Sequence, residues 1–368
     1  MTFKKLLATT ELLLNIFTLT GITAYAEEST SQVQETEISN KLPYGGNIII
    51  DLDFSTDVDD VCAVRMATSL DKMEKINLQG VMLCVTGENN VSAMYGLLSH
   101  DGYGDTPIGI SAYDIPDTSP YWNTLAGYGD VSQATVRESI RLYREILSNN
   151  EDDEKSIIVT TGYVSNIHAL MLSKPDDISD KTGKELLEEK VSAIYLTGGT
   201  YPEGCDNNFF YNKEARDGLS YLLNNCEVPL VFVTNDNGGP IKCGGEIQNN
   251  IKYIDDPVRK SLEAWGTSDG RASWDPMTVW FASLSEEDTR TTYDKIDMNF
   301  EVETGFNRIT ENEDGKYYRI HRIDDNYEWY KEQLDKLMLI NDLEIEEDTE
   351  QLDIEQSIKE VEQKDIAQ

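Results

Sequence analysis

Five aspartates lie close together near the start of the chain, directly after an apolar run. They are Asp51, Asp53, Asp57, Asp59 and Asp60. Carboxylates this close repel one another, and moving them out of water is costly unless a positive charge lies among them. A hard divalent cation held by oxygen ligands is the simplest such partner. The residues therefore predict a metal site at the end of a buried strand.

Three other interpretations of this acidic loop compete with the metal site. An EF-hand loop that starts at Asp51 needs Gly at its sixth position and Glu at its twelfth, but the chain has Thr56 and Cys62 there. A phosphatase of the haloacid-dehalogenase type has Asp-x-Asp after its first strand, but we find no downstream acidic pair to hold its magnesium. A solvated acidic loop that caps a helix stays open, with Asp57 as an N-cap-like residue.

Apolar, β-branched runs alternate with helical patterns over most of the chain. The expected strands are Asn47–Asp53, Leu78–Val85, Pro107–Ser111, Ser156–Thr161, Val191–Thr197 and Pro229–Thr234. The expected helices between them are Asp59–Ser69, Asn90–Ser99, Gln133–Leu147, Val164–Leu172 and Lys213–Leu223. This alternation predicts an α/β fold, a single large Rossmann-like domain with a mainly parallel central sheet. Ligands bind beyond the carboxyl ends of such strands, so the acidic loop should line that edge.

The last third of the chain is less regular. Helices are expected near Val258–Trp265, Asp275–Ser283 and Asn326–Leu339, and a hairpin is expected from Phe300–Glu303 and Tyr317–Ile320 around Asp314-Gly315. Residues 342–368 hold eleven acidic residues against two lysines, which predicts a solvated acidic tail. The domain is therefore expected at 45–341, after a flexible lead-in at 27–44.

The N-terminus has the pattern of a secretory signal peptide at residues 1–26. Lys4 and Lys5 form a basic start, Leu12–Ile22 is mostly apolar, and Ala24-Tyr25-Ala26 is a small-x-small cleavage site. We therefore expect a secreted protein. The net charge of −37 argues against binding to nucleic acid or to an anionic membrane surface, because both require clustered Lys and Arg.

The five cysteines match no zinc-binding pattern. Cys62 and Cys84 lie in apolar runs and are expected to be buried. A Cys205–Cys226 or a Cys226–Cys243 disulfide is an open alternative in a secreted protein. None of the five is interpreted as a nucleophile.

The acidic loop is the first of five motifs spread over residues 47–283. The others are Gly162-Tyr-Val-Ser-Asn166, Thr197-Gly-Gly199, Asp206-Asn-Asn-Phe-Phe-Tyr-Asn-Lys-Glu-Ala215 and Ser273-Trp-Asp-Pro276. In their order along the chain they resemble the signatures of the inosine–uridine nucleoside hydrolases. The corresponding family motifs are an N-terminal aspartate-rich loop, Gly-Pro-Leu-Thr-Asn, Met-Gly-Gly, Glu-Phe-Asn-(five residues)-Glu-Ala and His-Asp-Pro. Each motif is weak alone, and the set together is strong.

The resemblance implies a role for each matching residue. The implied ligands of a calcium ion are the carboxylates of Asp53, Asp60 and Asp275 and the backbone carbonyl of Ser165. Asp53 would also be the general base that takes a proton from the attacking water. The implied substrate-binding residues are Asp59, Asn90, Asp206, Asn208 and Trp274, with Asn89 an equal alternative to Asn90. Asp206 stands where the family usually has Glu, and Asp51 would support the metal ligands.

These roles imply calcium-dependent hydrolysis of the N-glycosidic bond of ribonucleosides to ribose and free base. Departure of the base leaves positive charge on the sugar ring, as in glycoside hydrolysis, and an acidic pocket stabilises that charge. The alternative is a non-catalytic, calcium-dependent protein that binds ribosyl groups or sugars on the same fold. The resemblance also implies a dimer or tetramer, although the sequence itself carries no interface signal.

Trp274 marks a departure from the family pattern. It stands where many members have a His that protonates the leaving base, and His100, His168 and His321 match no catalytic position. Trp274 either stacks on a purine through its π face or is a core aromatic. Both interpretations stay open at this point.

Overall fold

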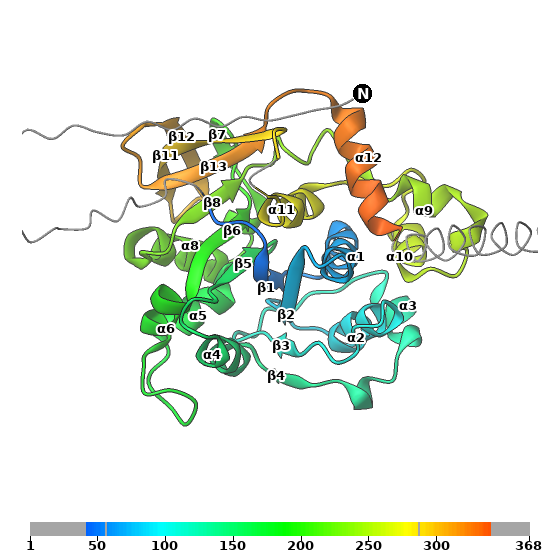
Figure 1. Cartoon of the computed structure of the whole chain (residues 1–368), viewed down its shortest axis with the longest axis horizontal. Helices are drawn as coiled ribbons and strands as arrows, with labels where there is room; N and C mark the ends of the chain where they lie inside the picture. Colours follow the sequence, from blue (N-terminus) through cyan, green and yellow to red (C-terminus); the bar gives the residue numbers. More distant parts are fainter. Residues whose placement is uncertain (1–41, 56, 286–287, 340–368) are drawn as a thin grey trace, which may run out of the picture. The chain divides into compact units, whose positions relative to one another are not determined.

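The apolar runs of the sequence form a large sheet in the computed structural model of the protein (Figure 1). The structure describes residues 42–55, 57–285 and 288–339. The expected signal peptide, the lead-in up to residue 41 and the acidic tail lie outside these residues, so they stay predictions. All described residues belong to one structural unit, Leu42–Gln368.

Each strand expected between residues 47 and 234 is present, and several further strands, most of them short, occur along the chain. They are β1 Gly46–Leu52, β2 Ile76–Leu83, β3 Ile108–Ile110, β4 Val136–Glu138, β5 Ser156–Thr160, β6 Val191–Thr197, β7 Glu203–Cys205, β8 Leu230–Val233, β9 Lys242–Cys243, β10 Arg271–Ala272, β11 Thr291–Glu301, β12 Phe306–Glu311 and β13 Tyr317–Arg322. The main sheet has the order β4-β3-β2-β1-β5-β6-β8-β13-β11-β12-β7, and β9 pairs separately with β10. Pairing is parallel from β4 to β13 and antiparallel beyond. The expected α/β fold with a mainly parallel sheet is confirmed.

Helices cover both faces of the sheet. They are α1 Asp59–Lys72, α2 Asn90–His100, α3 Trp122–Leu125, α4 Ser139–Asn149, α5 Ser165–Leu172, α6 Gly183–Lys190, α7 Asn207–Phe210, α8 Lys213–Asn225, α9 Gly245–Asn249, α10 Pro257–Trp265, α11 Trp274–Ala282 and α12 Tyr327–Met338. Successive side chains of a strand point to opposite faces. Ile48 and Ile50 accordingly join the apolar core beside α1 and α11, and Ile49 joins the core beside α4, α5 and α8. Both cores are fully buried along β1.

Two expected elements differ in the structure. The expected hairpin of Phe300–Glu303 with Tyr317–Ile320 is wrong, because Phe300 and Glu301 end β11 and pair with β12. Strand β13 pairs instead with the earlier part of β11, Thr291–Ile296. The hairpin is instead β11–β12, which turns through Gly305 at a positive φ of 71°. The helix expected from Gln133 begins only at Ser139, since Val136–Glu138 adds an edge strand to β3.

The fold brings several chain segments to one edge of the sheet. Asp53 directly follows β1 and Thr161 directly follows β5, and the Thr161 N–H donates to the Asp51 carbonyl to extend this ladder (2.8 Å). Helix α11 packs against α1, and the hydroxyl of Thr278 is 2.7 Å from that of Thr197 at the end of β6. The starts of α1 and α11 therefore lie together beyond the carboxyl ends of the central strands.

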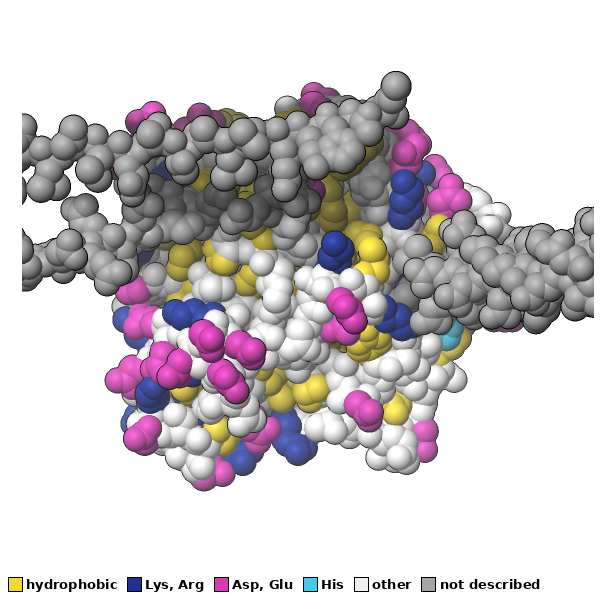
Figure 2. Space-filling model, in the orientation of Figure 1, with side chains coloured by type: hydrophobic (Ala, Val, Ile, Leu, Met, Phe, Trp, Pro, Cys, Tyr) yellow, Lys and Arg dark blue, Asp and Glu magenta, His cyan; other side chains and the backbone are white. Residues whose placement is uncertain are grey.

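The visible surface is acidic but mixed. Figure 2 shows Asp and Glu side chains spread over this face, with Lys and Arg between them rather than gathered in one basic patch. Within the described residues, every helix is too short or too polar to cross a membrane.

Candidate functional site

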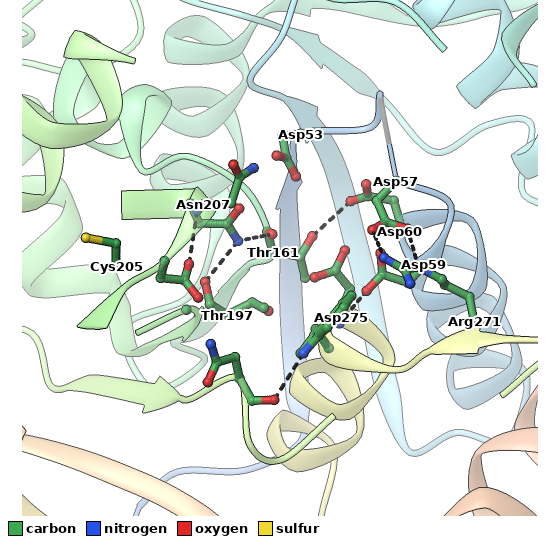
Figure 3. A pocket seen from close by; sticks show the side chains of 15 residues that line it. Asp53, Asp57, Asp59, Asp60, Thr161, Thr197, Cys205, Asn207, Arg271 and Asp275 are labelled. Carbon is green, nitrogen blue, oxygen red and sulfur yellow. Dashed lines mark hydrogen bonds and ion pairs between the residues drawn. The ribbon is translucent and has the colours of Figure 1, made fainter. Parts of the chain in front are cut away.

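A cavity of about 340 Å³ lies at the carboxyl edge of the sheet, between the start of α1 and the start of α7 (Figure 3). Its wall includes seven of the residues to which the resemblance gives a metal-binding or substrate-binding role: Asp53, Asp59, Asp60, Asp206, Asn208, Trp274 and Asp275. The cavity therefore collects residues from both ends of the chain. Asp59 and Asp275 even touch directly, because the Asp275 N–H donates to the Asp59 carboxylate at 3.2 Å across 216 residues of sequence.

The carboxylates of the cavity hold their protons more tightly than ordinary aspartates. Burial raises the pKa of Asp53 to about 7, and the nearby charges of Asp117 and Asp57 add to this shift. Burial also raises the pKa of Asp60 well above its usual range, followed by the charges of Asp53 and Asp59. The pKa of Asp275 is raised in the same way, by burial first and then by Asp59 and Asp60. Mutual repulsion of this kind is what a bound cation relieves.

The opposite wall of the cavity carries Asp206 and Asn208. Asp206 caps α7 by accepting the Asn208 backbone N–H (3.0 Å), and burial raises its pKa to about 6. The side-chain amide of Asn208 donates to the carbonyls of Thr161 (2.7 Å) and Thr197 (3.1 Å), which ties α7 to the ends of β5 and β6. These bonds use the Nδ2 group, so the Oδ1 of Asn208 is left as an acceptor.

The same fold occurs in solved structures of nucleoside hydrolases. An inosine–uridine preferring nucleoside hydrolase from Bacillus anthracis is 15% identical over 80% of this chain and 99% of its own, with a TM-score of 0.58. A purine-preferring ribonucleoside hydrolase from Gardnerella vaginalis is 16% identical over 79% of this chain and 98% of its own, also at 0.58. The type III effector XopQ, solved with adenosine diphosphate ribose, is 14% identical over 81% and 94%, at 0.56.

The chain has the nucleoside hydrolase fold. No protein-family model and no curated protein matches the sequence. At this level of identity the likeness establishes the architecture, and the activity has to be argued from the residues of the cavity.

Two implied site residues lie away from the cavity of this nucleoside hydrolase fold. Ser165 is fully buried at the start of α5, and its hydroxyl has no hydrogen-bond partner among the described residues. Asn90 is buried at the start of α2, where its amide donates to the Val85 carbonyl at 2.9 Å. Asn89 is exposed and donates to Asn123. Neither Asn lines the cavity.

Thr161 lies where Ser165 was expected to act. It lines the cavity, its hydroxyl donates to Asp60 at 3.2 Å, and its carbonyl accepts from Asn208. The next residue, Gly162, packs against Asp53 so closely that an added Cβ would be 2.3 Å from the Asp53 nitrogen. Thr161 directly precedes the Gly162–Asn166 motif, and this position was the only feature of the sequence that could have predicted its place at the site.

Asp51 lies below the cavity, as expected for a supporting residue. It accepts hydrogen bonds from Asn166 (3.0 Å) and Tyr143 (2.9 Å), and burial raises its pKa to about 7. Asn166, the last residue of its motif, also donates to the Leu83 carbonyl at 3.1 Å. The motif thus links β1, β2 and α5 beneath the acidic loop.

The residues present fit a calcium ion in chemistry. The cavity wall offers hard oxygen donors from Asp53, Asp60 and Asp275. The pKa values of these carboxyl groups are raised, so a positive charge among them would stabilise their ionised forms. Within the described residues, no three His, Cys, Asp or Glu side chains are already grouped as a metal cluster. The three carboxylates therefore suit calcium in the chemistry of their donor atoms.

Cysteines and histidines contribute little to the site. All five cysteines are free, so neither alternative disulfide forms in this structure. Cys205 lines the cavity and is exposed, whereas the other four are buried. No His lines the cavity among the described residues. His168 packs on the ring of Tyr221 at 4.8 Å, and burial lowers its pKa.

Proposed function

We propose that this protein hydrolyses the N-glycosidic bond of ribonucleosides, releasing ribose and free base, and that it requires calcium. One observation carries the proposal. Carboxylates from the β1–α1 loop and from α11 meet at one cavity, at the sheet edge where α/β proteins bind ligands. The likeness in fold to an inosine–uridine preferring and a purine-preferring nucleoside hydrolase supports the same reaction class.

Asp53, Asp60 and Asp275 are the carboxylates that would hold the calcium, together with one backbone carbonyl. Ser165 is the carbonyl donor that the sequence resemblance implies, and Thr161 is the alternative that its place in the cavity wall favours. Oxygen donors in an irregular arrangement suit calcium better than magnesium, which demands near-ideal octahedral geometry. When bound, calcium lowers the pKa of nearby water and relieves the repulsion among the carboxylates.

The protein's own groups then carry the reaction. Asp53 takes the proton of the attacking water, whose oxygen forms a bond to C1′ of the ribose as the C1′–N bond breaks. Asp59, Asp206 and the Oδ1 of Asn208 accept hydrogen bonds from ribose hydroxyls. The acidic wall stabilises the positive charge that develops on the ring more strongly in the transition state than in the bound nucleoside.

The test is release of base and ribose from inosine, adenosine, guanosine, uridine and cytidine. Each is assayed with calcium, with a chelator, and with calcium returned after chelation. We expect turnover of at least one nucleoside, lost on chelation and restored by calcium, and absent in Asp53→Ala. Asp314→Ala, in the exposed turn between β12 and β13, is the matched control. No turnover of any nucleoside refutes the proposal, and tight ribose binding without product would indicate the non-catalytic alternative.

We also propose that the protein is exported, because residues 1–26 have the pattern of a signal peptide. The mature chain then begins at Glu27, which N-terminal sequencing of the secreted protein would detect. A dimer or tetramer, which the family resemblance implies, is tested by light scattering on the same sample.

A further inference from the structure

Arg271 is the one Lys or Arg side chain in the wall of the cavity, among the described residues. It begins β10 and stands three residues before Trp274. Its Nε and Nη2 donate to the two carboxylate oxygens of Asp57, at 2.8 and 2.6 Å. A guanidinium held by two parallel hydrogen bonds to one carboxylate has a fixed orientation.

The same guanidinium lies over two indole rings. Its central carbon lies 4.5 Å from the ring of Trp265 and 4.8 Å from the ring of Trp274. The third nitrogen, Nη1, makes no hydrogen bond to any described residue. Arg271 therefore presents an oriented hydrogen-bond donor without a partner among the described residues at the cavity wall. Figure 3 shows Arg271 beside Asp57.

The ion pair with Asp57 does not by itself account for this arrangement. The side chains of Arg271 and Asp57 are 26% and 34% exposed, and an ion pair with that access to water contributes little to stability. Burial raises the pKa of Asp59 and the Arg271 charge partly offsets this shift, and the arrangement also places a permanent positive charge against the indole of Trp274. By sequence resemblance, that indole occupies the position from which a His protonates the leaving base.

We propose that Arg271 is the catalytic residue at the leaving-group end of the cavity. This inference rests on the proposed nucleoside hydrolysis. Nη1 donates a hydrogen bond to an acceptor atom of the departing base, such as a purine ring nitrogen or a pyrimidine carbonyl. As the C1′–N bond breaks, its electron pair passes to the base, and the guanidinium stabilises the resulting negative charge.

The guanidinium does not give up a proton in this step. Arg remains charged at any pH at which proteins fold, so the base receives its proton from water after the bond has broken. The hydroxide that this water leaves is neutralised by the proton that Asp53 accepted, so the net products are ribose and neutral base and Asp53 is ionised again. Arg271 thus does by charge what the family's His does by proton transfer. The substrates that depend on it are nucleosides whose bases are poor leaving groups.

The test compares two substrates that differ in leaving group. Inosine has a poor leaving group, whereas p-nitrophenyl β-D-ribofuranoside releases a stable anion that needs no help from the protein. Arg271→Gln is expected to lower kcat/KM for inosine about 100-fold and that for the nitrophenyl riboside less than about 3-fold. Arg271→Lys keeps the charge without the fork and should lose less on inosine than Arg271→Gln.

The matched control is Arg141→Gln in α4. Arg141 also makes a two-point pair with an aspartate, from Nη1 and Nη2 to Asp177 at 3.1 and 3.0 Å, outside the cavity wall. Arg141→Gln should leave kcat/KM for both substrates unchanged. Equal losses on both substrates in the Arg271 variants would overturn the inference while leaving the proposed hydrolysis intact. If the wild-type protein cleaves neither substrate, the proposed function fails and this inference falls with it.

Discussion

Replacement of Asp53 by Asn should separate the stability of the protein from its activity. Asn keeps the size of the side chain and one acceptor oxygen, and it removes the charge. Burial raises the pKa of Asp53 from 3.8 to about 7. Without calcium, the folded protein therefore holds this proton more tightly than the unfolded chain does, and ionised Asp53 destabilises the fold.

The sign and size of the effect follow from the two pKa values. Because the folded-state pKa is the higher one, the penalty is absent below pH 3.8, grows as pH rises, and is complete above about pH 7. At about 1.4 kcal/mol for each pKa unit, the penalty is about 4 kcal/mol at pH 8 and about 2 kcal/mol at pH 5. Both figures are upper bounds, because Asp53 is only half-buried and water screens part of its charge.

The assay is urea unfolding of the chelated wild-type and Asp53→Asn proteins at pH 8 and pH 5. The variant should be the more stable protein at pH 8, and its advantage should shrink by about half at pH 5. It should also have lost nucleoside turnover, since the proton acceptor is gone. Asp314→Asn controls for the loss of a surface charge. A variant no more stable than wild type at pH 8, or an advantage that does not change with pH, would refute the reasoning.

Three further variants follow from the packing around the cavity. Gly162→Ala places a Cβ 2.3 Å from the Asp53 nitrogen, so it should destabilise the folded protein by about 1–3 kcal/mol and lower kcat. Gly127→Ala is the control, because open space surrounds Gly127, and it should change neither quantity. Thermal unfolding and nucleoside turnover measure both effects. Ser165→Ala should keep full activity and equal or higher stability, because its buried hydroxyl has no hydrogen-bond partner among the described residues; a large loss of turnover contradicts this. Asn166→Ala removes the hydrogen-bond donor to the buried Asp51 carboxylate and to the Leu83 carbonyl. It should lower the free energy of unfolding by about 3 kcal/mol, measured by urea titration.

The central strands and the acidic loop were predictable because each signal is local. A buried parallel strand is a continuous apolar run, and Asp53 follows one directly, with Asp59 and Asp60 at the start of the next helix. Asp275 was reachable only through the family resemblance, since no periodicity joins residues more than two hundred positions apart. The strand order beyond β8 was not predictable from the sequence. Strand β11 lies between β12 and β13 in the sheet, although the Asp314-Gly315 turn connects β12 and β13 along the chain.

The missed residues of the cavity share a physical reason. Arg271 and Thr161 are ordinary residues in sequence, and their importance comes from neighbours that only the fold supplies. Asp57 was interpreted as an N-cap-like residue, but the N-cap of α1 is Val58 and no side chain caps it. Asp57 accepts the Val58 N–H at 2.7 Å and anchors Arg271. Asn90 was placed at the site by a loose alignment, and the fold instead buries it, with its amide donating to the Val85 carbonyl just after β2.

A crystal grown with calcium would test the central claim most directly, which is that distant carboxylates form one calcium site in this cavity. The account predicts an anomalous scattering peak about 2.3–2.6 Å from oxygens of Asp53, Asp60 and Asp275 together. Its remaining protein ligand should be a backbone carbonyl, which would decide between Thr161 and Ser165. A cavity without a peak at saturating calcium, or a peak bound without Asp275, would contradict it.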